Sequence, residues 1–254
     1  MTADRVLVTA GGAGIGQAIA LAYVTTGAKV AICDVDKASL DAMRTNHRGV
    51  TACYADVSNA GDLDRLFGRL YEEWGGIDVL VNNAGIGGPR APVEETDEAE
   101  WRQCVDVNLT GAFLAMKRAI PSMKQQRSGC IINISTSSAR TGLPNRGAYV
   151  ASKAGLIALS VNTAREVGPW NIRCNAILPG LIDNDRGRSL ITKFADERSL
   201  PIEQAREAFL SFVSMRTMIA PAEVAELSVF LSGQGGSHIT GQAIGVDGNL
   251  EWEG

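Results

Sequence analysis

The stretch RVLVTAGGAGIG, residues 5–16, predicts a strand that runs through a glycine-rich turn into a helix. Arg5–Thr9 is short, apolar and β-branched, and apolar residues recur with helical spacing after the turn, through Val24. Glycines in such a turn let the backbone approach a pyrophosphate, which the N–H groups and positive end of the following helix can bind. A tight strand-to-helix connection without a ligand is the alternative. The expected coenzyme contacts are Gly11, Gly14, Ile15 and Gly16.

A second buried strand, residues 28–33 (AKVAIC), is followed by Asp34, eighteen residues after the last glycine of the turn. A carboxylate at this place accepts hydrogen bonds from the adenosine ribose hydroxyls and repels a 2′-phosphate, so the sequence favours NAD over NADP. The uncharged Ala13 and Val35 offer no partner for that phosphate, and Lys37 is interpreted as a solvated residue in the next helix. A helix N-cap or turn is the alternative role for Asp34.

The rest of the chain alternates strand and helix signals, which predicts a parallel sheet with right-handed crossovers. No repeat, low-complexity tract or charge block interrupts the pattern, so residues 1–254 are expected to form a single α/β domain with a doubly wound sheet. Ligands then collect at the carboxyl ends of the strands. Further strands are expected at residues 50–54, 77–81, 130–135, 172–178 and 243–246, and helices at about 59–74, 96–126 and 220–231.

Two further stretches lie where a ligand would bind. Asp56 and Val57 follow the third strand, and Asp56 is expected either to meet an adenine amino group or to cap the next helix. Residues 181–217 are polar and helical with charges of both signs, which suits a mobile lid over the site. An ordinary pair of surface helices is the alternative.

Residues 148–154 (AYVASKA) place a phenol and an ammonium one helical turn apart on the same helix face. A tyrosine has an ordinary pKa of about 10. A nearby cation such as Lys153 favours the phenolate, which suits Tyr149 to exchange a proton near neutral pH. An ordinary buried aromatic beside a solvated charge is the alternative. A cluster of hydroxyl groups, Thr136, Ser137 and Ser138, precedes Tyr149 by eleven to thirteen residues.

Composition and charge exclude several classes of protein. A net charge of −4 and a pI of about 5.3 do not indicate the excess of positive charge with which proteins bind nucleic acid or an anionic membrane. No window reaches the length of about 18 apolar residues that a membrane span needs, and the first ten residues do not resemble a signal peptide. Five cysteines without a Cys-x-x-Cys pair indicate reduced core residues, and the two histidines lack ligand spacing. The sequence therefore predicts a cytoplasmic protein without a protein-bound metal.

Together, these motifs resemble those of the short-chain dehydrogenase/reductase family along the whole chain. The resemblance implies a Rossmann-type fold, nicotinamide-dependent interconversion of an alcohol and a carbonyl compound, and a homotetramer. The elements that carry it, in the family's order, are TAGGAGIG at 9–16, Asp34, Asp56 with Val57, NNAG at 82–85, Asn108, YVASK at 149–153 and PG at 179–180.

The resemblance also implies roles for single residues. Tyr149 is expected to be the catalytic acid/base, and Lys153 to lower its pKa and bind the nicotinamide ribose. Asn108 is expected to anchor a water that links Lys153 to solvent, and Thr136 to orient the substrate oxygen. The implied coenzyme contacts are Asn83, Ala84, Gly85, Pro179, Gly180 and Ile182, with Tyr149 and Lys153.

Three positions depart from the family's pattern. Ala10 replaces the first glycine of the turn, and the next residue, also a glycine, is expected to supply the flexibility. Thr136 replaces the catalytic serine and keeps the hydroxyl, while its methyl group narrows the pocket. Ser135 or Ser137 takes the role if the loop shifts by one residue. Asn184 stands where the family often has a threonine near the nicotinamide carboxamide.

The sequence thus predicts an NAD-dependent oxidoreductase that interconverts a secondary alcohol and a ketone. An NADPH-dependent 3-oxoacyl-type ketoreductase is the nearest alternative, and Asp34 counts against it. A non-catalytic dinucleotide-binding protein and a cofactor-free lyase, as in halohydrin dehalogenation, are alternatives from other classes. Loop arginines favour a polar substrate such as a sugar, polyol or hydroxy acid, although a plain surface role is equally open for each: Arg90, Arg140, Arg146, Arg186 and Arg188.

Overall fold

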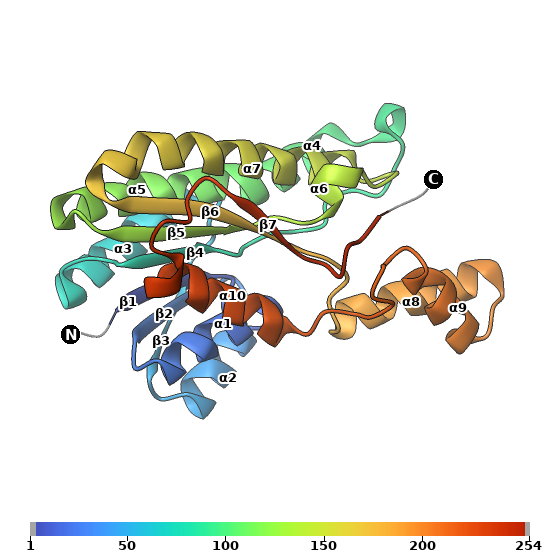
Figure 1. The fold of residues 1–254 in the computed structure, drawn as a ribbon, viewed down its shortest axis with the longest axis horizontal. Coiled ribbons are helices and arrows are strands. Elements are labelled where there is room, and N and C mark those ends of the chain that lie inside the picture. Colours follow the sequence, from blue (N-terminus) through green and yellow to red (C-terminus); the bar gives the residue numbers. More distant parts are fainter. Residues whose placement is uncertain (1–3, 252–254) are drawn as a thin grey trace.

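Seven parallel strands form one sheet in the centre of the molecule (Figure 1). The structure, a computed structural model, describes residues 4–251 apart from the side chain of Arg186. The strand order is β3-β2-β1-β4-β5-β6-β7, so the winding direction reverses between β1 and β4. The strands are β1 (Arg5–Thr9), β2 (Lys29–Asp34), β3 (Val50–Tyr54), β4 (Val79–Asn82), β5 (Gly129–Ile134), β6 (Ile172–Pro179) and β7 (Ala243–Val246).

Helices cover both faces of the sheet. One face carries α1 (Gly14–Thr25), α2 (Lys37–Asn46) and α10 (Pro221–Ser232), and the other carries α3 (Ala60–Trp74), α5 (Gly111–Gln126) and α7 (Gly147–Val167). The remaining helices are α4 (Glu98–Val105), α6 (Ser138–Thr141), α8 (Asp185–Arg198) and α9 (Ile202–Leu210), with short 3₁₀ turns at Val93–Glu95, Gly168–Trp170 and Gln234–Gly236.

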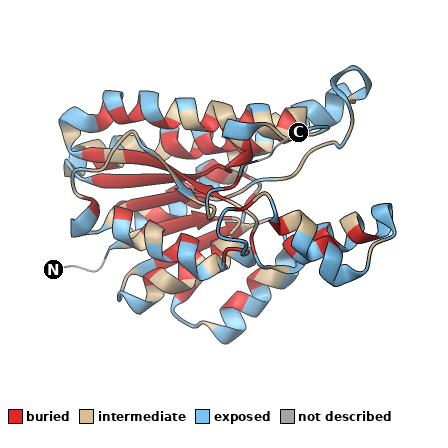
Figure 2. Ribbon diagram, turned by 45° about the vertical axis from the view of Figure 1, so that its right-hand side comes forward, coloured by how far each residue is buried: buried red, intermediate tan, exposed pale blue. Residues whose placement is uncertain are grey.

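The strands read as continuous apolar runs because both of their faces are buried, as Figure 2 shows. Side chains alternate across each strand, so neighbouring residues join different cores. In β1, Val6 and Val8 belong to the core beneath α1 and α10, whereas Leu7 belongs to the core beneath α3, α5 and α7. The predicted single α/β domain with a doubly wound parallel sheet is confirmed. In such a sheet a ligand binds where the strand order reverses, which is here at the carboxyl ends of β1 and β4.

The predicted helix over residues 96–126 is wrong in one respect. A single π-helical turn, Asp106–Thr110, separates α4 from α5 and contains the buried Asn108. Such turns are frequent at functional sites. A second difference is that β5 ends at Ile134, so Ser135 lies in the loop and not in the strand.

The segment expected to be a lid forms a helical pair with a small apolar core, which Leu250 from the end of the chain completes. Ile191 and Ala195 of α8 and Ala205 and Leu210 of α9 are buried in this cluster. Phe194 and Phe209 add an edge-to-face pair with ring centroids 5.5 Å apart. In Figure 1 the pair lies to one side of the sheet, close to the end of the chain drawn in red.

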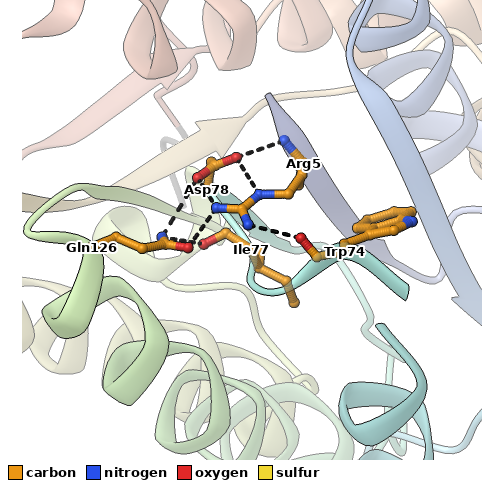
Figure 3. Close-up of polar contacts among 5 residues, drawn as sticks. All are labelled: Arg5, Trp74, Ile77, Asp78 and Gln126. Carbon is orange, nitrogen blue, oxygen red and sulfur yellow. Dashed lines mark hydrogen bonds and ion pairs between the residues drawn. The ribbon is translucent and has the colours of Figure 1, made fainter. Parts of the chain in front are cut away.

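At the opposite, amino end of the sheet, an ion pair joins β1 to β4 (Figure 3). The Arg5 guanidinium donates from Nε to Asp78 Oδ2 over 2.8 Å and from Nη2 to Asp78 Oδ1 over 2.6 Å. Its remaining donors reach the Trp74 carbonyl and the Gln126 side chain. This cluster lies far from the strand carboxyl ends and is part of the scaffold.

Candidate active site

The glycine turn after β1 is tight and leaves helix α1 without a side-chain cap. Ala10 has φ of 48° and Gly14 has φ of 57°, both in the left-handed region. A Cβ on Gly16 would lie 2.2 Å from the Ala10 carbonyl oxygen, so the backbones can approach only because glycine stands there. The N-cap residue Ala13 makes no side-chain hydrogen bond to the first turn. The N–H groups of that turn are therefore open to an anion, which fits a pyrophosphate.

The left-handed conformation falls on Ala10 itself. We expected Gly11 to supply the missing flexibility, but Gly11 is not among the residues with positive φ. Gly11 serves close packing instead, because a Cβ there would lie 2.5 Å from the Ile32 side chain.

Asp34, the last residue of β2, lies against the glycine turn. Its Oδ2 accepts the Gly12 N–H over 3.0 Å, and its Oδ1 accepts the Asp36 N–H over 3.1 Å. Asp36, not Asp34, caps α2 by accepting the Ala38 N–H. The carboxylate is half-buried beside the turn, where a coenzyme adenosine ribose would lie in a fold of this kind.

Asp56 makes a local turn. Its Oδ1 accepts both the N–H and the hydroxyl of Ser58, while Asn59 caps α3 by accepting the Asp62 N–H. The capping alternative for Asp56 is therefore wrong, and its adenine contact stays a prediction. The following Val57 is buried against Gly111 at the start of α5.

The NNAG segment after β4 is tied to the glycine turn. Asn83 Nδ2 donates to the carbonyls of Thr9 and Ala10 over 3.1 and 3.0 Å. Thr9 Oγ1 in turn accepts the N–H groups of Asn83 and Ala84, both over 3.0 Å. The carboxyl ends of β1 and β4 thereby hold one another in place.

Lys153 is part of α7 and faces the end of β5, and the residue is only 3 % exposed. The Nζ atom donates to the Ile134 carbonyl over 2.8 Å. A Cβ on Gly85 would lie 3.0 Å from this Nζ and 3.2 Å from Asn108 Oδ1. The ammonium group, Gly85 and Asn108 are thus brought together, although 68 residues separate Gly85 from Lys153 in the chain.

Asn108 is held by the loop after β4 and by α7. Its Oδ1 accepts the Ile86 N–H over 2.7 Å, and its Nδ2 donates to the Ile86 carbonyl and to Ser152 Oγ, both over 3.0 Å. Ser152 Oγ also donates to the Tyr149 carbonyl over 2.9 Å. Ser152 is a site residue that the sequence motifs did not predict, and its place inside the YVASK stretch was the available signal.

The three candidate hydroxyls differ in what they bind. Ser135 Oγ donates to the Lys153 carbonyl over 2.8 Å, and Ser137 Oγ donates to Asp247 Oδ2 over 2.5 Å. Thr136 Oγ1 accepts only a long contact, 3.4 Å, from the Ser138 N–H among the hydrogen bonds of the described residues. Since both serine hydroxyls are engaged inside the protein, the geometry favours Thr136 over its neighbours as the group that meets a substrate.

Tyr149 lies one turn before Lys153 on α7 and is half-buried. The Arg146 guanidinium is 5.7 Å from the centroid of its ring. At the next strand end, Gly180 donates its N–H to the Val246 carbonyl, and the Pro179 carbonyl accepts the Ser137 N–H. These bonds join the ends of β6 and β7 to the loop that carries the hydroxyls.

Ile182 and Asn184 follow β6 and begin the predicted lid. Ile182 is buried and forms a bridge with Ile219, which brings the two ends of the segment together. Asn184 Oδ1 caps α8 by accepting the Gly187 N–H over 2.8 Å. Its Nδ2 lies 4.0 Å from the position of a Cβ on Gly14 and thus borders the glycine turn.

Most of the loop arginines that suggested a polar substrate are engaged elsewhere. Arg188 pairs with Asp183 and Asp185, and Arg140 donates to the Ala243 carbonyl. Arg90 lies 3.8 Å from a carboxylate oxygen of α8. Of the five, Arg146 is the one beside Tyr149, and the side chain of Arg186 is outside the described part of the structure.

The five cysteines are buried and free, as predicted for core residues. Burial raises the pKa of the Cys130 thiol to about 11 and that of Cys33 to about 12, so neither is a reactive thiolate at neutral pH. Within residues 4–251 no helix has the length and apolarity to cross a bilayer. The same residues contain no group of three or more His, Cys, Asp or Glu arranged to hold a metal ion.

A comparison with protein families matches residues 9–250 to the model described as enoyl-(acyl carrier protein) reductase, a member of the short-chain dehydrogenase/reductases. The chain belongs to the short-chain dehydrogenase/reductase family. The predicted resemblance is therefore confirmed, and with it an NAD(P)-dependent oxidoreductase acting on CH–OH or keto groups. The alternatives without turnover or without a nicotinamide coenzyme are not supported.

Relatives of known name are similar along their whole length. A 3-oxoacyl-(acyl-carrier-protein) reductase of Thermotoga maritima is 35% identical over 248 residues, covering 96% of each chain. Levodione reductase of Leifsonia aquatica is 32% identical, covering 96% of this chain and 93% of the relative. Among solved structures, a variant of actinorhodin polyketide ketoreductase with NADPH matches with a TM-score of 0.92 and 28% identity, covering 98% of this chain and 97% of the other.

The names of these relatives concern two of the predictions, the class of substrate and the choice between NAD and NADP. All three relatives are reductases of keto compounds, so the expected sugar, polyol or hydroxy acid finds no support among them. NADPH in the ketoreductase structure supports a nicotinamide coenzyme for the family without selecting NAD.

Proposed function

We propose that the protein reduces a ketone to a secondary alcohol, and catalyses the reverse reaction, at a site formed by Asn108, Thr136, Tyr149 and Lys153. The observation that carries this proposal is the attachment of Lys153 to the end of β5, because it joins the helix of Tyr149 to the loop of Thr136. These two bonds hold the loop of Thr136 against the helix of Tyr149 at the carboxyl edge of the sheet, which supports a shared site for the two hydroxyl groups. The keto substrates named for the relatives agree with the reductive direction.

In this mechanism the Thr136 hydroxyl donates a hydrogen bond to the substrate carbonyl oxygen and orients it. The Tyr149 phenol donates its proton to the same oxygen as the alcohol forms. The Lys153 ammonium favours the phenolate that remains, because an opposite charge nearby stabilises the ionised form. Asn108 fixes the loop after β4 beside Lys153 and holds the wall of the site in place. A bound nicotinamide coenzyme supplies the hydride.

NAD(H) is the coenzyme that this chain's own residues favour. The N–H groups at the start of α1 would hold the pyrophosphate, and Asp34 would accept hydrogen bonds from the adenosine ribose. A second carboxylate, Asp36, stands two residues further on. Both negative charges oppose a 2′-phosphate. An NADPH-dependent 3-oxoacyl-type ketoreductase is the second candidate, because relatives over the whole chain are named 3-oxoacyl-(acyl-carrier-protein) reductases and the similar ketoreductase structure contains NADPH.

Two further features belong to the proposal. Residues 181–217 act as a lid, since their two helices pack in a small core that is separate from the two cores of the sheet. The protein is a homotetramer, for which light scattering should give four times the chain mass of 26.9 kDa.

The test follows the absorbance of reduced nicotinamide over a panel of 3-oxoacyl thioesters, cyclic diketones, sugars and hydroxy acids, each with both coenzymes. We expect turnover of a keto compound with NADH, and replacing Tyr149 by Phe should lower kcat by about 10²- to 10⁴-fold while the Kd for NADH stays nearly constant. Tyr71→Phe is the matched control, because the Tyr71 hydroxyl donates to the Arg118 carbonyl away from the site. Turnover retained in Tyr149→Phe refutes the assignment, and a preference for NADPH selects the second candidate.

A further inference from the structure

The turn after β7 faces the loop that carries the candidate hydroxyls. Asp247 follows the last residue of β7, and its Oδ1 accepts the Asn249 N–H over 3.0 Å. Asn249 has φ of 60°, in the left-handed region that asparagine tolerates better than most residues. The carboxylate therefore belongs to a turn of defined shape.

The second carboxylate oxygen binds the hydroxyl loop. Ser137 Oγ lies 2.5 Å from Asp247 Oδ2 and 3.2 Å from the Leu178 carbonyl oxygen. Because the hydroxyl has one proton, it donates the stronger hydrogen bond to the nearer, charged carboxylate. The Ser137 side chain is only 2 % exposed, which protects this bond from water. A hydrogen bond between a hydroxyl and a charged carboxylate is stronger than one between neutral groups.

Thr136 has an anchored residue on each side. Ser135 is bonded to the Lys153 carbonyl, and Ser137 is bonded to Asp247 and, through its N–H, to the Pro179 carbonyl. Within the part of the chain that the structure describes, the Thr136 hydroxyl makes only the long contact to the Ser138 N–H. The Thr136 backbone accepts the Ala139 N–H at its carbonyl, over 3.1 Å, and the anchors of its two neighbours fix the rest of its position.

The turn that carries Asp247 is held from the opposite side. Ser214 and Met215, at the end of the predicted lid, donate their N–H groups to the carbonyls of Asn249 and Gly248, each over 3.1 Å. Asn249 Nδ2 also donates to Ser214 Oγ over 2.7 Å. The Asp247 turn thus joins the end of the lid segment to the hydroxyl loop, and a group that positions another needs such attachments.

We propose that Asp247 is a positioning residue for catalysis: its carboxylate fixes Ser137 and so aims the Thr136 hydroxyl at the substrate oxygen. The inference rests on the proposed function, which assigns that hydroxyl to the site. It adds a contact across 110 residues that the sequence motifs do not contain. The available signal was an aspartate at a strand carboxyl end, the same place that Asp34 occupies on β2.

The test uses Asp247→Asn, Ser137→Ala and the double variant. Asp247→Asn keeps the shape of the side chain and removes its charge, and we expect kcat to fall by about 10- to 100-fold, the effect of a misplaced catalytic group. The Kd for NADH should change less than twofold, because no proposed coenzyme contact is altered. Ser137→Ala should show a similar loss, and Ser137→Thr should recover most of the activity. The double variant should be no worse than either single variant, because both remove the same bond.

Hydrogen exchange of the amides of residues 135–141 gives a readout besides turnover, and it should accelerate in Asp247→Asn. Thr240→Ala is the matched control, because Thr240 Oγ1 accepts the Cys174 N–H at the other end of the β6–β7 pair. The control should lose stability without the loss of kcat. An unchanged kcat, unchanged exchange at 135–141, or additive losses in the double variant would each overturn the positioning role. Absence of turnover in the wild type is a different result, since it refutes the proposed function itself.

Discussion

Replacing Asp78 by Asn should destabilise the fold without changing turnover. Asp78 receives three hydrogen bonds from Arg5, from the main-chain N–H, Nε and Nη2, over 2.9, 2.8 and 2.6 Å. The two side chains are 28% and 21% exposed, and they join the amino ends of the neighbouring strands β1 and β4 (Figure 3). The amide variant keeps one acceptor oxygen and loses the charge that the guanidinium faces.

The magnitude lies between two limits. Exposed ion pairs contribute about 0 to 1 kcal/mol, whereas removing one partner of a fully buried pair costs about 3 to 5 kcal/mol. The Arg5–Asp78 pair is partly buried, and Arg5 retains the Trp74 carbonyl and Gln126 as partners after the change. We therefore expect the free energy of unfolding to fall by about 2 kcal/mol at neutral pH.

The effect should depend on pH with a defined sign. Burial alone would raise the pKa of Asp78, but the hydrogen bonds and charge of Arg5 outweigh it and hold that pKa below its usual range. A carboxylate with a lowered folded pKa stabilises the protein above its unfolded pKa, about 3.9, and loses that contribution as the pH falls through the folded value. Asp4 acts in the opposite sense, because burial and the charge of Asp78 raise its pKa.

The assay is urea unfolding of wild type and Asp78→Asn at pH 7 and at steps down to about pH 3, below the ordinary carboxyl pKa. The difference in the free energy of unfolding between the two proteins should be largest at pH 7 and should become smaller as the pH falls towards the folded pKa of Asp78. Glu98→Gln is the control, because the Arg102–Glu98 pair is 71% and 82% exposed, and we expect a change within about 0.5 kcal/mol. A difference below about 0.5 kcal/mol at pH 7, or one that grows in acid, would refute the reasoning.

Two further predictions concern the site. Ala10→Gly should stabilise the protein by about 0.5 to 1 kcal/mol in thermal unfolding. Ala10 has φ of 48°, and an L-residue in this left-handed region is destabilising by about 1 to 2 kcal/mol. Glycine removes this strain, but its greater conformational entropy in the unfolded chain offsets part of the gain. No gain in Tm would contradict a strained Ala10. Gly85→Ala should lower kcat by at least about tenfold, because its Cβ would lie 3.0 Å from Lys153 Nζ and displace the ammonium group. Gly68→Ala is its control, since nothing lies within 4 Å of a Cβ there, and a normal kcat in Gly85→Ala would argue against this contact.

The strands were predictable because their signal is local. Strands buried on both faces are apolar along their whole length, as in CIINI at the core of β5, and glycines or polar residues end them. The observed bounds of β1, β3 and β7 equal the predicted ones, and those of the other strands differ by one or two residues, for example Val79–Asn82 against residues 77–81. The residue types of the glycine turn and of the Tyr149–Lys153 pair also lie within one short segment each, so the sequence could place them on their elements.

The π-helical turn at Asn108 was not predictable, because its cause is not local. The sequence from residue 98 to 126 has a helical pattern throughout, and only the contacts of Asn108 with Ile86 and Ser152 explain why the amide is turned inward there. These partners lie 22 and 44 residues away along the chain. A pattern within one window contains no information about them.

The identity of the substrate-facing hydroxyl shows the same limit more sharply. Ser135, Thr136 and Ser137 are adjacent, and a register shift of one residue would exchange their roles, so the sequence left all three open. In the structure the serines have partners on different elements, the Lys153 carbonyl on α7 and the Asp247 carboxylate after β7. Because both serine hydroxyls have partners within the protein, we propose Thr136 as the group that meets the substrate, a choice that depends on contacts far apart in the sequence.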